Sequence, residues 1–124
     1  MVNAGITLVV GANDQQIAHL KNCLPAWECV SVPVNNQRIA IECSTTARPE
    51  VVILYAQAEA TSTLAICEQL RSDPNTAASA ILLAISRYEL SQRNAIEPLG
   101  NTGFIFKPFD QEELIVKIDQ LLNV

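Results

Sequence analysis

The sequence predicts a doubly wound α/β domain of the (βα)5 type, with a five-stranded parallel sheet between two layers of helices. Two observations predict it: short apolar runs alternate with segments of helical periodicity, and these runs are nearly continuous instead of alternating with polar residues. Such an order gives βαβ units, whose parallel sheet is buried on both faces. A chain of 124 residues, 49% of them hydrophobic, suits one domain, which we expect to span residues 1–124.

The strands are expected at five β-branched or aliphatic runs, which are Ile6–Val10, Cys29–Val34, Val51–Leu54, Ala80–Ile85 and Gly103–Phe106. Apolar residues at helical spacing predict helices at 16–24 and 61–71, between Ser86 and Gly100, and from Asp110 to the end of the chain. The segment 36–46 is the weakest helical candidate, because β-branched residues lower its helix propensity.

Capping-box patterns mark three of the expected helix starts. In each, a cap residue is followed three positions later by Glu or Gln, in the pairs Asn13 and Gln16, Ser86 and Glu89, Asp110 and Glu113. The two side chains satisfy backbone N–H groups that have no partner in the first turn.

Charge and composition exclude several classes of function. The net charge is −5 and the eight Lys and Arg residues are scattered, so direct nucleic-acid binding is not expected. No apolar run has the length of a membrane span, and the start resembles no signal peptide, so we expect a cytoplasmic protein. The four cysteines lack a CxxC or zinc-site spacing and His19 is the only histidine, which favours buried thiols, a solvated imidazole and neither metal nor cofactor.

In an open α/β sheet, the functional crevice lies beyond the carboxyl ends of the strands. The residues at these positions are Gly11 and Ala12, Tyr55, Ile85 and Ser86, and Lys107. No catalytic pair of nucleophile and base, carboxylate dyad or Gly-rich phosphate loop is found among them, so an enzyme is not expected.

The stretches RPEVVIL, LRSDPNTAASAILLAIS and GNTGFIFKPFDQEELIVKIDQLL resemble the receiver domain of bacterial response regulators over essentially the whole chain. The most specific part is the Lys-Pro-Phe beginning at Lys107, at the family's distance from the third-strand position Tyr55. The resemblance implies a flavodoxin-like or CheY-like three-layer sandwich. It also implies a role in two-component phosphorelay signalling, in which a histidine kinase phosphorylates an aspartate.

The family's chemistry needs two carboxylates for Mg²⁺, an acceptor Asp, a Thr or Ser, and a Lys, because a hard cation and a transferring phosphoryl group need oxygen ligands and positive charge. By this resemblance, the metal-binding pair falls on Gly11 and Ala12, the acceptor on Tyr55 and the hydroxyl on Ile85, beside Ser86. Only Lys107 agrees. The sequence therefore predicts a degenerate pseudo-receiver, with neither catalytic residues nor a metal site.

The polar and aromatic residues near these positions each have a structural interpretation. Asp14 is expected in the first turn of a helix, where the dipole favours a carboxylate, and Ser86 as a helix cap. Tyr55 is expected to fill the volume of the lost acidic cluster. Lys107 has lost its anionic partner, and it is expected to donate to Tyr55 or to backbone carbonyls, or to stay a strand-end cation.

A signalling module of this kind would act by protein–protein interaction with a kinase, an output protein or a second copy. In the family, the face of the fourth helix, fifth strand and fifth helix commonly makes such contacts, including dimerisation. Candidate residues on it are Phe104, a switch or core aromatic, and Arg87, Tyr88, Arg93, Glu112 and Lys117. Two alternatives stay open: a domain that senses a ligand or redox state, and a regulatory domain cut from a larger multidomain protein.

Overall fold

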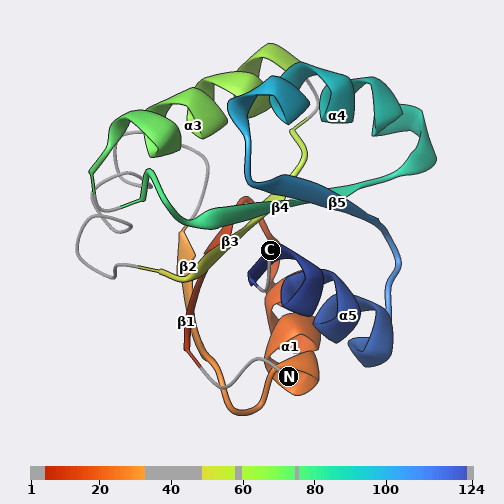
Figure 1. The fold of residues 1–124 in the computed structure, drawn as a ribbon. Helices are drawn as coiled ribbons and strands as arrows, with labels where there is room; N and C mark the ends of the chain where they lie inside the picture. Colours follow the sequence, from red (N-terminus) through yellow and green to blue (C-terminus); the bar gives the residue numbers. More distant parts are fainter. Residues whose placement is uncertain (1–4, 33–48, 58–59, 75, 123–124) are drawn as a thin grey trace.

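A five-stranded parallel sheet with the order β2-β1-β3-β4-β5 forms the centre of the molecule (Figure 1). A computed structural model describes residues 5–32, 49–57, 60–74 and 76–122 of the chain. The strands are β1 (Ile6–Val10), β2 (Glu28–Val32), β3 (Val51–Tyr55), β4 (Ala80–Ile85) and β5 (Thr102–Phe106). They confirm the predicted doubly wound fold, whose order reverses between β1 and β3.

Helices cover both faces of the sheet, with α1 and α5 on one side and α3 and α4 on the other (Figure 1). Their bounds are α1 (Asp14–Cys23), α3 (Ala60–Ser72), α4 (Leu90–Ile96) and α5 (Gln111–Leu122), with short 3-10 turns η1 (Arg87–Glu89) and η2 (Glu97–Leu99). The helix expected at 36–46 lies outside the described residues. No helix within the described ranges has the length and apolar character needed to cross a membrane.

The fourth helical segment is shorter than the sequence predicts. In place of one helix between Ser86 and Gly100, the structure has the three pieces η1, α4 and η2. Pro98 accounts for the last division, because proline lacks the N–H that would continue the α-helical hydrogen bonds. Gly100, with φ of 76°, then ends the segment in a conformation that favours glycine.

Two apolar clusters hold the layers together, and the central strands contribute to both. Every residue of β3 and β4 is buried, as expected for strands that are covered on both faces. Successive side chains of a strand point to opposite faces. Ile53 and Tyr55 therefore join the α1/α5 cluster, whereas Val52 and Leu54 join the α3/α4 cluster.

The loops before β4 and β5 are joined by one side chain, Arg71, from the last turn of α3. Its guanidinium donates to five backbone carbonyls, those of Thr76, Ala77, Ser79, Gly100 and Asn101. Burial lowers the pKa of Arg71 from its ordinary value. The amino ends of two strands are thus fixed by a single cation.

Candidate functional site

The loop after β1 carries no carboxylate before Asp14. Gly11 adopts a left-handed φ of 80°, and its N–H donates to the carbonyl of Val32 at 3.2 Å. Ala12 packs against the α1/α5 cluster. Asn13 caps α1 in the predicted capping box: its side chain accepts from Gln16 N–H at 2.8 Å, and Gln16 accepts from Asn13 N–H at 2.9 Å. Asp14 is the exposed first residue of α1.

Tyr55, the last residue of β3, is buried to 3% exposure within the α1/α5 cluster. Burial, with a smaller contribution from Cys23, raises the pKa of Tyr55 to about 12. The phenol is therefore neutral at physiological pH and carries one donor proton. The side chain that ends β3 is thus an apolar ring with a weak polar end.

Lys107 lies over this ring. Its Nζ is 5.8 Å from the centroid of Tyr55, within the range of a cation–π contact. The same Nζ is 3.5 Å from Oε1 of Glu89. The expectation that Lys107 lacks an anionic partner is therefore wrong. Its partner is the carboxylate of Glu89, which follows the end of β4.

Glu89 belongs to this edge of the sheet, although the sequence did not single it out as a site residue. Its Oε1 also accepts from the backbone N–H of Ser86 at 2.8 Å, so one oxygen atom serves the start of η1 and the pair with Lys107. The capping-box pattern is the signal that could have found it, because this pattern turns the Glu side chain back toward its cap residue.

Ile85 and Ser86 do not join Tyr55 and Lys107 through their side chains. Ile85 is fully buried in the α3/α4 cluster, and its carbonyl accepts from Lys107 N–H at 2.8 Å. Ser86 is half-buried and begins η1. Of the sequence-predicted positions, the structure therefore brings Tyr55 and Lys107 together.

Two glutamines connect the loop after β3 with α4. Gln57 Nε2 donates to the carbonyl of Tyr55 at 2.7 Å, and Gln57 N–H donates to Thr63 Oγ1 at 3.0 Å. Gln92 Nε2 donates to the carbonyl of Gln57 at 2.8 Å. Gln92 is 4% exposed, and the described residues offer its buried Oε1 no hydrogen-bond partner. No sequence motif indicates this connection.

His19 and the cysteines differ in their surroundings. The exposed His19 ring lies 5.1 Å from that of Phe109, and its Nε2 is 3.5 Å from Cys23 Sγ. Burial raises the pKa of the thiols of Cys23, Cys29 and Cys67, in the last case to about 12. These thiols stay protonated at neutral pH, which disfavours a redox role, since thiolates are the reactive form. Cys43 lies outside the described residues.

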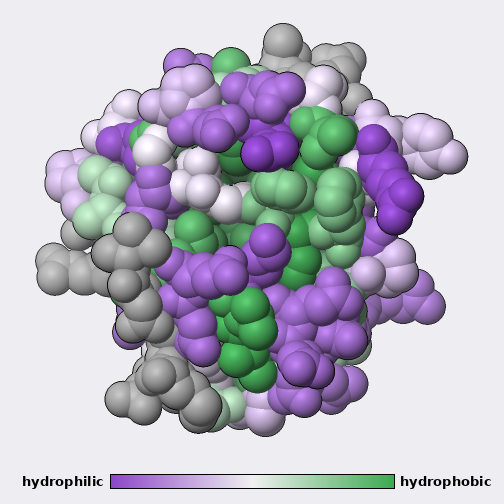
Figure 2. Space-filling model, turned by 45° about the vertical axis from the view of Figure 1, so that its right-hand side comes forward, coloured by the Kyte–Doolittle hydropathy of each residue, from purple (hydrophilic) through white to green (hydrophobic). Residues whose placement is uncertain are grey.

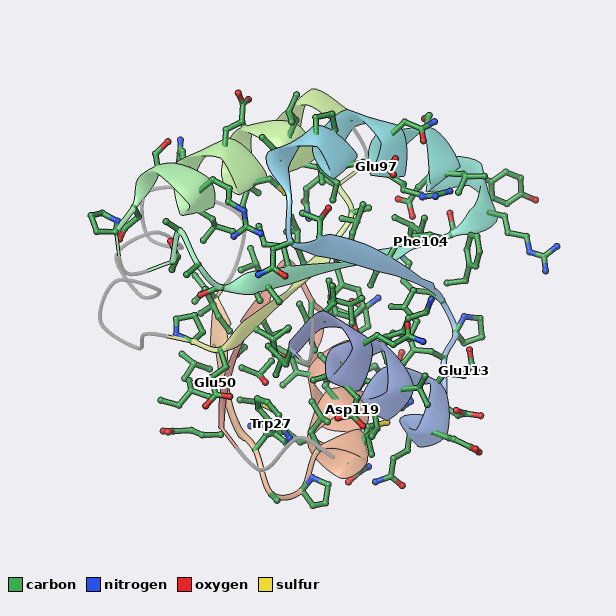
Figure 3. The ribbon with its side chains drawn as sticks, viewed as in Figure 1. Trp27, Glu50, Glu97, Phe104, Glu113 and Asp119 are labelled. Atoms are coloured by element: carbon green, nitrogen blue, oxygen red, sulfur yellow. The ribbon has the colours of Figure 1, made fainter. Side chains whose placement is uncertain are left out.

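Phe104 occupies the middle of the face formed by α4, β5 and α5 (Figure 3). The Arg93 guanidinium lies 4.5 Å and the Lys117 Nζ 5.4 Å from its ring centroid, and the Phe106 ring meets it edge-on at 5.3 Å. Phe104, Arg93 and Lys117 also border a hollow of about 240 Å³. Phe104 is half-buried, so its ring is neither fully enclosed in the core nor fully exposed to solvent.

Large apolar side chains are exposed on this same side of the molecule. Within the described ranges, they are Tyr88, Leu90, Phe106 and Val116, and all four belong to η1, α4, β5 or α5. Tyr88 is 99% exposed. Figure 2 turns this side forward and shows apolar side chains gathered at a hollowed region with hydrophilic ones around them. Exposed apolar side chains gathered on one side of a protein are typical of interaction sites.

Solved structures of receiver domains share this architecture. The chemotaxis response regulator CheY4 of Vibrio cholerae is 18% identical, with a TM-score of 0.78 over 98% of this chain and 100% of that one. The receiver domain of a histidine kinase from Syntrophus aciditrophicus is 23% identical, with a TM-score of 0.76 over 96% of this chain and 90% of that one. The chain has the receiver fold.

A third structure, a putative response regulator from Chloroflexus aurantiacus, is 21% identical, with a TM-score of 0.76 over 95% of this chain and 98% of that one. No protein-family model matches the sequence, and no curated protein does. At these identities the likeness concerns the receiver fold alone, so the role of the strand-end residues rests on their own chemistry.

Proposed function

We propose that this receiver-fold domain is a non-catalytic module of two-component signalling, which acts through protein recognition and not through phosphoryl transfer. The observation that carries the proposal is Tyr55 at the end of β3, 3% exposed and neutral at physiological pH. A phenol cannot form the acyl phosphate that an aspartate forms. Gly11 and Ala12, at the end of β1, have no side-chain oxygen for Mg²⁺.

The proposed recognition surface is the α4–β5–α5 face. The exposed Tyr88 and Phe106 supply apolar area, and Arg87, Arg93 and Glu112 supply charge around it. Aromatic residues and arginine are the side chains that most often dominate the energy of protein interfaces. The partner is a signalling kinase, an output protein or a second copy of this chain, in the cytoplasm and without direct contact to nucleic acid.

The phosphoryl-transfer part is tested with acetyl phosphate and Mg²⁺, followed by intact-mass spectrometry. We expect the mass of this chain to show no added phosphoryl group. The chemotaxis regulator of Vibrio cholerae, treated in parallel, serves as the positive control. Detection of an aspartyl phosphate on this chain, removable by hydroxylamine, would contradict the proposal.

The surface part is tested with a photo-crosslinking amino acid at Tyr88, and at Glu28 on edge strand β2 as the matched exposed control. Crosslinking is performed in the cells that produce the protein, and the adducts are identified by mass spectrometry. A defined adduct from position 88 with a kinase, an output protein or this same chain supports the face. Equal adducts from both positions, or none from position 88, would reject it.

A further inference from the structure

A second hollow lies at the carboxyl edge of the sheet, where the strand order reverses, away from the Phe104 face. Its volume is about 430 Å³, within the usual range of small-molecule sites. Three elements line it: α1, the end of β3, and the loop between β5 and α5. The lining residues are Gln15, Gln16, His19, Tyr55, Lys107, Pro108 and Phe109.

The walls of this hollow are flat rings from three separate elements. Tyr55 and Phe109 are buried to 3% and 6% exposure, so their rings are held by the core. His19 is exposed and lies at a tilt of 44° to the Phe109 ring. Rigid aromatic walls favour a planar ligand, because ring stacking adds to the gain from buried area.

The polar groups of the hollow favour a negative charge on that ligand. Lys107 is its cation, with a side chain 27% exposed and paired with one carboxylate oxygen at 3.5 Å. An ammonium has three donors, so this pair leaves donors for an incoming carboxylate. Gln15 is exposed in the first turn of α1, and its side-chain amide is a second possible donor. The side-chain oxygen of Gln16 accepts the cap bond from Asn13 N–H at 2.9 Å.

We propose that this hollow binds a small planar aromatic carboxylate, with its ring against the side chains of His19, Tyr55 and Phe109 and its carboxylate on Lys107. The inference is independent of protein recognition at the Phe104 face. It concerns a different ligand class from a phosphoryl group, because it uses one cation and three rings and needs no metal.

The test uses benzoate as the probe and the full chain labelled with ¹⁵N, followed by NMR titration. We expect saturable shifts at the amides around residues 16–20, 55–57 and 107–110, with a dissociation constant on the order of 1 mM, as for a ligand of few atoms. Benzamide, which lacks the charge, and cyclohexanecarboxylate, which lacks the flat ring, should each bind at least about fivefold more weakly.

Lys107→Met should weaken benzoate binding about tenfold, the usual loss for a hydrogen bond to a charged group. Lys117→Met is the matched control, since that lysine also lies over an aromatic ring but on the Phe104 face. The affinity of this variant for benzoate should be unchanged. His19→Ala removes a ring from an exposed position and gives a second variant that keeps the core. Equal affinity in all three variants, equal binding of the three probes, or no saturable shift would overturn the proposal.

Discussion

Each edge of the sheet holds one prominent cation, and the two cations differ in how many contacts the fold makes with them. At the amino edge, Arg71 donates to five backbone carbonyls from two loops. At the carboxyl edge, the described residues give Lys107 one carboxylate at 3.5 Å and the face of one ring at 5.8 Å. Both terminal nitrogen atoms of Arg71 are therefore bound by the fold, whereas the ammonium of Lys107 keeps donors for another partner.

The largest effect is expected from Arg71→Met, which leaves five carbonyls without their shared donor. We expect the free energy of unfolding to fall by about 3 kcal/mol, as when a hydrogen-bond network is broken. Urea denaturation measures it, with Arg87→Met as the control for an exposed arginine. Equal effects of the two substitutions would show that the amino edge does not depend on this cation.

Tyr55 should make the carboxyl edge sensitive to high pH. Its folded pKa of about 12 lies above the ordinary value of 10.0, so the folded state holds the proton more tightly than the unfolded state. This contribution to stability is complete below pH 10 and is lost as the pH rises toward 12, by at most about 3 kcal/mol.

Tyr55→Phe should therefore lose less stability than the parent between pH 10 and 12, measured by urea denaturation at each pH. Tyr88→Phe is the control, because that side chain is 99% exposed. A parallel pH profile for Tyr55→Phe and the parent would contradict the assigned burial of the phenol.

A smaller loss is expected from Gln92→Ala, because the carbonyl of Gln57 would lose its donor at 2.8 Å. We expect a cost of about 1–2 kcal/mol, the usual result for one buried polar group left unpaired. Thermal unfolding measures it, with Gln120→Ala on the exposed side of α5 as the control. A gain in stability would contradict this prediction, since burying the Oε1 of Gln92 would then cost more than its hydrogen bond contributes.

The smallest effect is expected from the pair of Lys107 and Glu89, whose side chains are 27% and 22% exposed. A double-mutant cycle with Glu89→Gln and Lys107→Met should give a coupling of about 0.5 kcal/mol, and less in high salt. Glutamine keeps an acceptor for the N–H of Ser86, so the start of η1 is preserved. A large coupling that is independent of salt would show that the fold holds Lys107 as firmly as it holds Arg71.

The layers and the strands could be predicted well, because periodicity and capping are local signals. The capping box of Asn13 and the buried runs of β3 and β4 are examples. Topology placed Lys107 and Tyr55 at the same edge of the sheet but left their contact as one of three alternatives, and the structure has the ammonium 5.8 Å from the ring centroid.

Hydrogen bonds from side chains to backbone carbonyls distant in sequence could not be predicted. Arg71 reaches carbonyls about thirty positions ahead, and Gln92 reaches back to Gln57 across a similar interval. Single side chains of this kind leave no periodic trace, and Arg and Gln are equally common on solvated helix faces. The division of the fourth helical segment does have a local signal, because Pro98 is a helix breaker that periodicity alone ignores.

The position of Glu89 has a mechanical consequence. One of its oxygen atoms supports both the first turn before α4 and the ammonium group at the mouth of the sheet. A ligand that drew that ammonium toward itself would remove one of the two contacts of this oxygen, and the N–H of Ser86 would remain as its hydrogen-bond donor. Ligand binding at the carboxyl edge would thus leave the carboxylate of η1, the turn that contains Tyr88, without its cation and with no covalent change to the protein.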